Sequence, residues 1–337
     1  MRRRRWLLGS WIALAALGHK AMAEGPAWSL RIATIAPDGT GWARELRAFA
    51  REVETSTGGA LRIKFYFGGV AGDDVRAAER IARDQLDGLA SGGILCERLS
   101  PSMRALRVLG LFRDRSEWEY TLARMKPVFD EEFDRAGFVN LAEGGVGPHV
   151  LFTDRPIARL ADLARVRLWV WDLDDVMRLE LPELGARTVT LPMDAATRAH
   201  DERRTDGFVS PPTVALAFQW SVQARYVSDL PLDYISACLL VARRAFDPLP
   251  LEVRKALEAA AAKLRVRFED LGRRQDAALL GGVFARQGLE AVPASGSLRA
   301  EYLAATRAAR DRLGERLVPR PLLERVQSVI DEYRAGH

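Results

Sequence analysis

Several features that mark catalytic or metal-binding proteins are missing from this sequence. Its two cysteines and four histidines do not stand at the spacing that metal ligands require. No serine lies in a Gly-x-Ser-x-Gly motif, and no pairing of a nucleophile with a base can be recognised. We therefore expect no metal site, no cofactor and no catalytic residues, and we predict that the protein is not an enzyme.

Long apolar runs are missing too, and the longest one is near the start of the chain. The basic run Arg2–Arg5 precedes an apolar stretch from Trp6 to Leu17, and Ala21-Met22-Ala23 then places small residues at a cleavage site. This order is typical of a secretory signal peptide, and the stretch is shorter than the roughly 20 residues of a membrane span. We predict a cleaved signal peptide over 1–23 and a periplasmic protein, with an uncleaved anchor as the alternative.

An excess of charge is missing once this segment is removed. The chain has 50 basic and 45 acidic residues, and residues 1–23 carry five basic residues and no acidic one. Residues 24–337 are therefore formally neutral, which argues against a nucleic-acid partner. Export would allow Cys96 and Cys238 to pair. Their separation neither supports nor excludes pairing, and we expect two separate buried thiols, with a disulfide as the alternative.

Strand and helix patterns alternate through the first half of the chain. Leu30–Ile35 and Leu61–Phe67 have the composition of strands, and between them Trp42, Leu46, Phe49 and Val53 recur at helical spacing. A helix at about 73–87 and an apolar run at 89–95 follow. The β-α-β-α-β order predicts a parallel sheet covered by helices. Gly68, Gly69 and Gly72 lack the lysine of a phosphate-binding loop and are interpreted as turn residues.

A second set of elements begins near Gly144. Strands are predicted at 150–153, 166–171, 187–191, 207–209 and 235–242, with a helix at 176–184. Beyond Pro250 an apolar stripe continues to about Leu280, and a helix of some 30 residues would be about 45 Å long. We predict an α/β protein of two lobes with a central cleft and a long C-terminal helix that spans both. The first lobe would be 27–147 plus about 236–265, and the second 148–235 plus about 266–337.

Several motifs, in this order, resemble those of TRAP-type (tripartite ATP-independent periplasmic) solute-binding proteins of the C4-dicarboxylate-binding, DctP-like family. The motifs are Leu30–Trp42, Gly58–Gly72, Asp206-Gly207, Pro211-Pro212 and the helix beyond Pro250. The resemblance covers nearly all of residues 24–337. It implies a two-lobed periplasmic-binding-protein fold, a small-molecule ligand in the cleft, and delivery to a membrane permease.

One position departs from the family pattern. Where the strand after Asp162-Leu163 usually carries an arginine for the ligand carboxylate, this chain has Trp169, and Arg167 lies two residues earlier on the same face. The segment Ser210–Trp220 resembles a subfamily that lacks this arginine, is associated with a periplasmic tetratricopeptide-repeat partner, and is thought to bind apolar ligands. We expect a cleft without an arginine that clamps a carboxylate.

Candidate ligand-binding residues follow from strand ends and from the resemblance. Ligands in open α/β sheets lie beyond the carboxyl ends of strands, and Trp169 and Trp171 share a face at such an end. For Phe208 and Val209 the pattern favours core and cleft equally, and for His149 it slightly favours a structural role. The candidates are Trp169, Trp171, Phe208, Val209, Ala36, Pro37, Gly93, His149, Gln219 and Arg167.

The sequence thus predicts a transport protein that binds an apolar or amphipathic molecule, because a buried carboxylate without a paired charge costs several kcal/mol. The alternative keeps the fold and binds an organic acid through a relocated arginine such as Arg167. A periplasmic enzyme on the same fold is a remote alternative.

Overall fold

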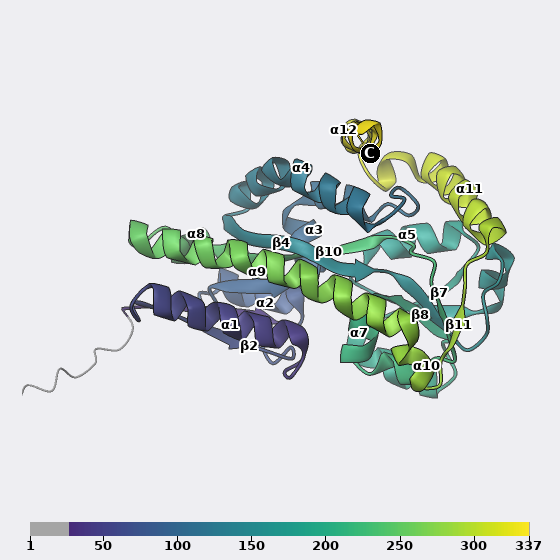
Figure 1. Ribbon diagram of the computed structural model, residues 1–337, viewed down its shortest axis with the longest axis horizontal. Coiled ribbons are helices and arrows are strands. Elements are labelled where there is room, and N and C mark those ends of the chain that lie inside the picture. The colour runs from purple at the N-terminus through teal and green to yellow at the C-terminus, as the bar shows by residue number, and fades with distance from the viewer. Residues whose placement is uncertain (1–26, 337) are drawn as a thin grey trace, which may run out of the picture.

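The computed structural model describes residues 27–336, which form two α/β lobes, each built on its own sheet (Figure 1). The first sheet has the strand order β2-β1-β3-β10-β4, and the second has the order β11-β9-β5-β8-β6-β7. The predicted two-lobed α/β fold is confirmed. The predicted signal peptide, 1–23, lies outside the described residues. None of the helices within 27–336 is both long enough and apolar enough to cross a membrane.

The first lobe begins with parallel strands joined by helices. Helix α1 forms where the Thr40 side chain accepts a hydrogen bond from the Ala43 amide, and Leu46, Phe49 and Val53 bury one face. Its elements, in order, are β1 (Trp28–Thr34), α1 (Gly41–Ser56), β2 (Leu61–Tyr66), α2 (Asp74–Ala82), β3 (Gly88–Ser91), α3 (Ile94–Leu99), η1 (Pro101–Arg107), α4 (Arg115–Arg135) and β4 (Phe138–Pro148).

The chain then enters the second lobe, whose middle strands β5, β8 and β6 carry buried aromatic side chains. The elements are β5 (Val150–Thr153), η2 (Leu160–Arg165), β6 (Arg167–Trp171), α5 (Asp175–Glu183), β7 (Arg187–Leu191), η3 (Met193–Ala195), α6 (Ala196–Asp201), β8 (Gly207–Ser210), α7 (Pro212–Ala217), η4 (Trp220–Gln223) and β9 (Tyr226–Ser228). Phe208 stacks on Phe152 of β5, with ring centroids 4.9 Å apart.

The chain next returns to the first lobe. Strand β10 lies antiparallel between β3 and β4, so the first sheet is completed by residues far along the sequence. The remaining elements are β10 (Tyr234–Ala242), α8 (Arg243–Phe246), α9 (Leu251–Ala278), η5 (Leu279–Val283), α10 (Phe284–Arg286), β11 (Glu290–Val292), α11 (Gly296–Leu313), η6 (Gly314–Arg316) and α12 (Arg320–Gly336).

Helix α9 is the predicted long helix that spans both lobes (Figure 1). Its first turns bury Leu257 and Leu264 in the core beneath α1. The helix continues through a π-helical turn into the second lobe, where Phe284 packs edge-on against Phe152 with ring centroids 5.4 Å apart. A helical segment that kinks at Gly282, whose φ is 137°, therefore connects the two cores.

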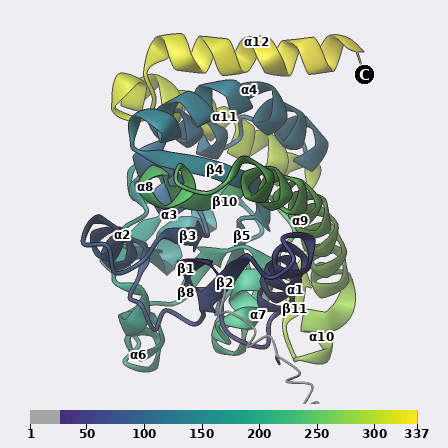
Figure 2. The ribbon, with the colours of Figure 1, turned by 90° about the vertical axis from the view of Figure 1, so that its left-hand side faces the viewer.

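The end of the chain differs from the sequence-based lobe assignment. Helix α12 lies along α4 of the first lobe, as Figure 2 shows, although 266–337 had been assigned to the second lobe. Val326 and Ile330 are buried there in the same cluster as Trp118 and Phe129. The amphipathic stripe of α12 indicates that one face is buried, but it does not indicate against which lobe.

Cys96 and Cys238 form a disulfide, so the expectation of two separate thiols was wrong. Antiparallel pairing places Cys238 opposite Ser91, and α3 begins three residues after Ser91. This register brings Cys96 over the strand, with the two Cα atoms 5.9 Å apart. The sequence separation of 142 residues conceals this proximity.

Candidate functional site

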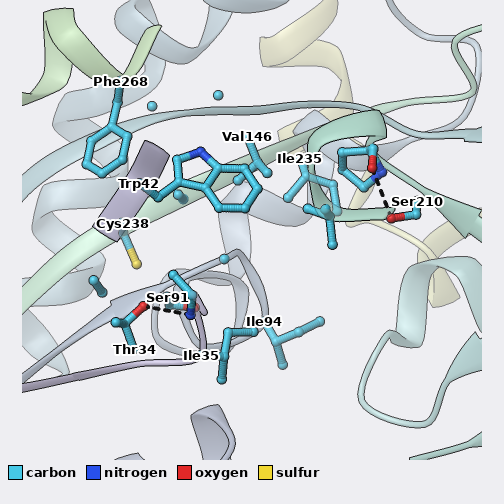
Figure 3. Close-up of a pocket in the computed structure, with 18 of the residues that line it drawn as sticks. Thr34, Ile35, Trp42, Ser91, Ile94, Val146, Ser210, Ile235, Cys238 and Phe268 are labelled. Carbon is cyan, nitrogen blue, oxygen red and sulfur yellow. Dashed lines mark hydrogen bonds between the residues drawn. The ribbon is translucent and has the colours of Figure 1, made fainter. Parts of the chain in front are cut away.

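A cavity of about 190 Å³ lies between the lobes (Figure 3). The first lobe contributes the ends of β1 and β3 and residues 142–146 of β4, and the second contributes the ends of β6 and β8. This placement follows from the topology, because the carboxyl ends of neighbouring parallel strands leave a crevice there. An apolar cavity of about 150 Å³ accommodates benzene, so this volume fits in proportion a ligand of roughly eight heavy atoms.

Aromatic side chains form much of the wall. Trp169 packs edge-on against Trp220, with ring centroids 4.8 Å apart, and Phe218 stacks on Trp220 at 5.0 Å. The indole Nε1 of Trp169 donates a hydrogen bond to the carbonyl of Leu191 at 3.0 Å. Because its one polar group is satisfied by the backbone, Trp169 presents apolar surface to the cavity.

Two helices complete the wall with residues that the sequence analysis did not identify as site residues. Trp42 comes from α1, and Phe268 and Arg265 come from α9. Figure 3 shows the rings of Trp42 and Phe268 on one side of the pocket. Trp42 and Phe268 belong to apolar helical stripes, a pattern that core residues share, so only their position near the strand ends could have suggested the cavity.

Among residues 27–336, four charged or titratable side chains line the cavity, and each has a partner within the protein. Glu143 lies 3.1 Å from Nζ of Lys126, and Asp174 accepts a hydrogen bond from Arg107 at 2.9 Å. Nδ1 of His149 lies 2.6 Å from Oδ1 of Asp233. Arg265 lies 3.2 Å from Oε1 of Glu269. Within the part of the chain that the structure describes, no charged side chain of the cavity wall therefore lacks a partner.

Arg107 organises the charges at the junction of the lobes. Its guanidinium is fully buried and contacts three carboxylates: Asp233 at 2.5 Å, Glu97 at 2.8 Å and Asp174 at 2.9 Å. Burial raises the pKa of Glu97, against the opposing charge of Arg107. Burial would also raise the pKa of Asp233, but the charges of His149 and Arg107 lower it below its usual value.

The structure matches one known family over most of the chain. The sequence profile described as "Bacterial extracellular solute-binding protein, family 7" covers residues 32–315. This chain belongs to that family. Among curated proteins, no sequence matches the chain.

Solved structures of TRAP periplasmic solute-binding proteins share the fold. One from Haemophilus influenzae, with bound L-gulonate, has a TM-score of 0.81 at 15% identity, covering 92% of this chain and 99% of its own. A Bordetella pertussis extracytoplasmic solute receptor binding pyroglutamic acid has 0.79 at 22%, covering 91% and 99%. One from Desulfovibrio salexigens with bound orotic acid has 0.80 at 17%, covering 90% and 99%.

The solute-binding protein brings five of the ten predicted site residues to the cavity, namely Ala36, His149, Trp169, Trp171 and Val209. Phe208 is next to Val209, and adjacent strand residues point to opposite faces, so it packs on Phe152 instead. Gly93 is the residue just before α3 and has φ 126°; a Cβ atom at this position would lie 3.0 Å from the carbonyl oxygen of Ser236. Pro37 and Gln219 lie in turns and do not line the cavity.

Arg167 also lies outside the cavity lining. It is at the amino end of β6, where its Nη2 and Nε donate to Asp206 at 2.7 and 2.8 Å. The hydrogen bond to Arg167 lowers the pKa of Asp206, and the reciprocal hydrogen bond raises the pKa of Arg167. This bidentate pair joins β6 to the residue preceding β8, which indicates a structural role.

Proposed function

We propose that this solute-binding protein captures a small apolar or amphipathic molecule in the interlobe cavity and delivers it to a TRAP membrane permease. One observation supports this most: every charged side chain of the described cavity wall already has a partner elsewhere in the protein. Trp169 adds to it, because it stands where the family resemblance leads one to expect the arginine that binds a carboxylate.

The physical argument concerns uncompensated charge. A dicarboxylate brings two negative charges into a cavity walled by indole and phenyl rings, and each charge that lacks a partner there costs several kcal/mol. His149 is held by Asp233, so it is not free to provide the compensation, and Asp174, itself a carboxylate, would repel a ligand carboxylate. Apolar surface, by contrast, gains about 25 cal/mol for each Å² removed from water.

The proposal also covers the export of the protein, its cellular location, its subfamily and the boundaries of its lobes. Residues 1–23 act as a cleaved signal peptide, the protein is periplasmic, and it binds its ligand without catalysing a reaction. The resemblance of 210–220 supports membership of the subfamily without the carboxylate-binding arginine, and the proposal includes that subfamily's tetratricopeptide-repeat partner. The lobes are 27–147 with about 236–265, and 148–235 with about 266–318, with α12 added to the first. N-terminal sequencing of periplasmic material is expected to begin at Glu24, and a soluble protein that retains Met1 would contradict export.

A second function has some support. The three solved structures described above contain or bind organic acids, and one arginine, Arg265, lines the cavity here. The alternative is therefore an organic acid, bound through that side chain rather than through Arg167.

The experiment that separates the two is extraction of the purified protein and mass spectrometry of what co-purifies, followed by calorimetry. An amphipathic molecule in the extract, together with no detectable binding of succinate, is the expected result. Succinate binding that is tighter than that of any extracted apolar compound would overturn the proposal.

A further inference from the structure

The disulfide borders the cavity through one of its two residues. Cys238 lines the cavity, whereas Cys96 is not among the residues of 27–336 that do so. Cys238 keeps 3% of its surface exposed, and Cys96 keeps none. Figure 3 shows Cys238 and its sulfur atom among the side chains of the pocket wall. A small molecule inside the cavity therefore meets Cys238 before it meets Cys96.

The register of the first sheet explains why Cys238 lies there. Cys238 of β10 pairs with Ser91 of β3 on one side and with Glu143 of β4 on the other. Residues that pair directly across neighbouring strands point to the same face of the sheet, and all three of these residues line the cavity. The cavity therefore reaches the sheet face on which the disulfide lies.

The side of the disulfide away from the cavity is closed by packed side chains. Cys96 and Cys238 belong to a buried cluster that also contains Met103, Trp118 and Leu240. Close packing of this kind leaves no passage for a dissolved reagent. The small exposed part of Cys238 is therefore on the cavity side, and the cavity is the route to the disulfide in the folded protein.

We propose that Cys238 is a thiol-modification site inside the cavity, where a low-molecular-weight thiol cleaves the disulfide. The thiolate form of that molecule attacks Sγ of Cys238 and forms a mixed disulfide with it. The bond between the two cysteines breaks, and Cys96 leaves as a thiolate, which takes up the proton that the attacking thiol lost. One thiol is consumed for each disulfide cleaved, and no other oxidant or reductant takes part.

Modification of Cys238 and binding of a ligand compete for the same space. The group attached to Cys238 occupies part of the cavity, so a thiolated protein cannot also hold a ligand there. A bound ligand in turn covers Sγ of Cys238 and slows the attack, because access decides which sulfur a thiolate reaches. The competition applies whether the ligand is apolar or an organic acid, so it goes beyond the proposed function.

The test compares the reaction of the purified wild-type protein with 2-mercaptoethanol and with glutathione. Acid stops each reaction, and mass spectrometry of peptides locates the adduct. We expect the 2-mercaptoethanol adduct on Cys238 and a free thiol on Cys96. Each rate is divided by the rate on protein unfolded in guanidinium chloride, which removes differences in intrinsic reactivity. On this scale glutathione, which has about twenty heavy atoms and exceeds the cavity, should react at least about tenfold more slowly than 2-mercaptoethanol.

Two matched variants test the same asymmetry without a disulfide. Cys96→Ser leaves Cys238 as the one thiol, and Cys238→Ser leaves Cys96. Relative to the unfolded variants, iodoacetamide should alkylate Cys238 at least about tenfold faster than Cys96, because thiol reactivity follows exposure. Circular dichroism and thermal unfolding establish that both variants fold, and the wild-type experiment does not depend on them.

Benzyl alcohol, with about eight heavy atoms, is the probe for the competition, and calorimetry gives its dissociation constant. At about ten times that constant it should slow the reaction of wild type with 2-mercaptoethanol about tenfold. An adduct on Cys96, or equal relative rates for the two thiols, would overturn the assignment of Cys238. A reaction rate that bound benzyl alcohol leaves unchanged would overturn the competition.

Discussion

Nδ1 of His149 lies 2.6 Å from Oδ1 of Asp233, and the two residues belong to the two segments that join the lobes between β4 and β5 and before β10. Their backbones are also bonded: the amide of His149 donates to the carbonyl of Asp233 at 2.9 Å, and the amide of Leu232 donates to the carbonyl of His149 at 2.8 Å. Asp233 in turn accepts from Arg107. A ligand that contacts His149 would therefore contact a residue that is hydrogen-bonded to the Arg107 ion-pair cluster at the junction of the lobes.

Asp233→Asn tests the importance of this junction. The change removes one of three carboxylates from the buried guanidinium of Arg107, and losing a hydrogen bond to a charged group costs about 1.5–3 kcal/mol of unfolding free energy. Denaturant unfolding measures the loss. Asp175→Asn is the control, because Asp175 forms an exposed pair with Arg178 and its loss should cost less than about 1 kcal/mol. Equal effects of the two changes would contradict the proposed role of the cluster.

The two tryptophans of β6 should differ when each is changed to alanine. Trp169 is buried against Trp220, so Trp169→Ala should lower the unfolding free energy by about 3–5 kcal/mol as well as weaken ligand binding. Trp171 is only partly buried, so Trp171→Ala should cost less stability while still weakening binding. Thermal unfolding and ligand titration on both variants check this. A Trp169→Ala protein as stable as wild type would disprove the packing.

Arg167→Ala should leave ligand affinity within about twofold of wild type, because Arg167 pairs with Asp206 and does not line the cavity. Titration with the co-purified ligand is the measurement. A loss of affinity of tenfold or more would show that this arginine reaches the ligand, as the organic-acid alternative first supposed.

The disulfide should contribute to stability. Cys96 and Cys238 close a loop of 142 residues across the first lobe, and losing a native disulfide typically costs about 2–5 kcal/mol. Thermal unfolding with and without a reductant should therefore differ for wild type. The double variant Cys96→Ala, Cys238→Ala serves as the control, since it should melt at the same temperature in both conditions.

The raised pKa of Glu180 predicts that the free energy of unfolding depends on pH. Burial raises its pKa to about 8, although its carboxylate oxygens accept the amide of Leu109 at 3.2 Å. Because the folded state holds this proton more tightly than the unfolded state, the stability due to Glu180 is complete below about pH 4.5 and is lost as the pH rises through about 8. Glu180→Gln should gain about 2–3 kcal/mol over wild type between about pH 6 and about pH 9. A constant difference across that range would contradict the shift.

The fold could be predicted well where one face of an element is buried. Strands β5 and β7 have the predicted bounds, 150–153 and 187–191, because their short apolar or alternating runs end at turn residues. The sequence analysis assigned no element to residues 101–143, where α4 and most of β4 lie. Helix α4 contains Pro127 and many charged residues, and both obscure its periodicity.

The site was predictable only where it follows from topology. Ala36, Trp171 and Val209 lie at or near the carboxyl ends of strands, and ligands in open α/β sheets bind beyond such ends. Trp42, Arg265 and Phe268 come from helices, where spacings of three and four residues look the same whether a side chain faces core or cavity. The pairing of Cys96 with Cys238 depends on the register of β10 against β3, which no local pattern contains.

The return of α12 to the first lobe has a consequence for the time course of folding. The cluster around Trp118 and Phe129 includes Val326 and Ile330. The side chains of α4 can therefore complete their packing only with residues of α12, which are synthesised much later. Contacts between such distant residues form slowly, since a long loop must close before they contribute. The cluster of the first lobe can therefore be completed only after α12 has been synthesised and has docked against α4.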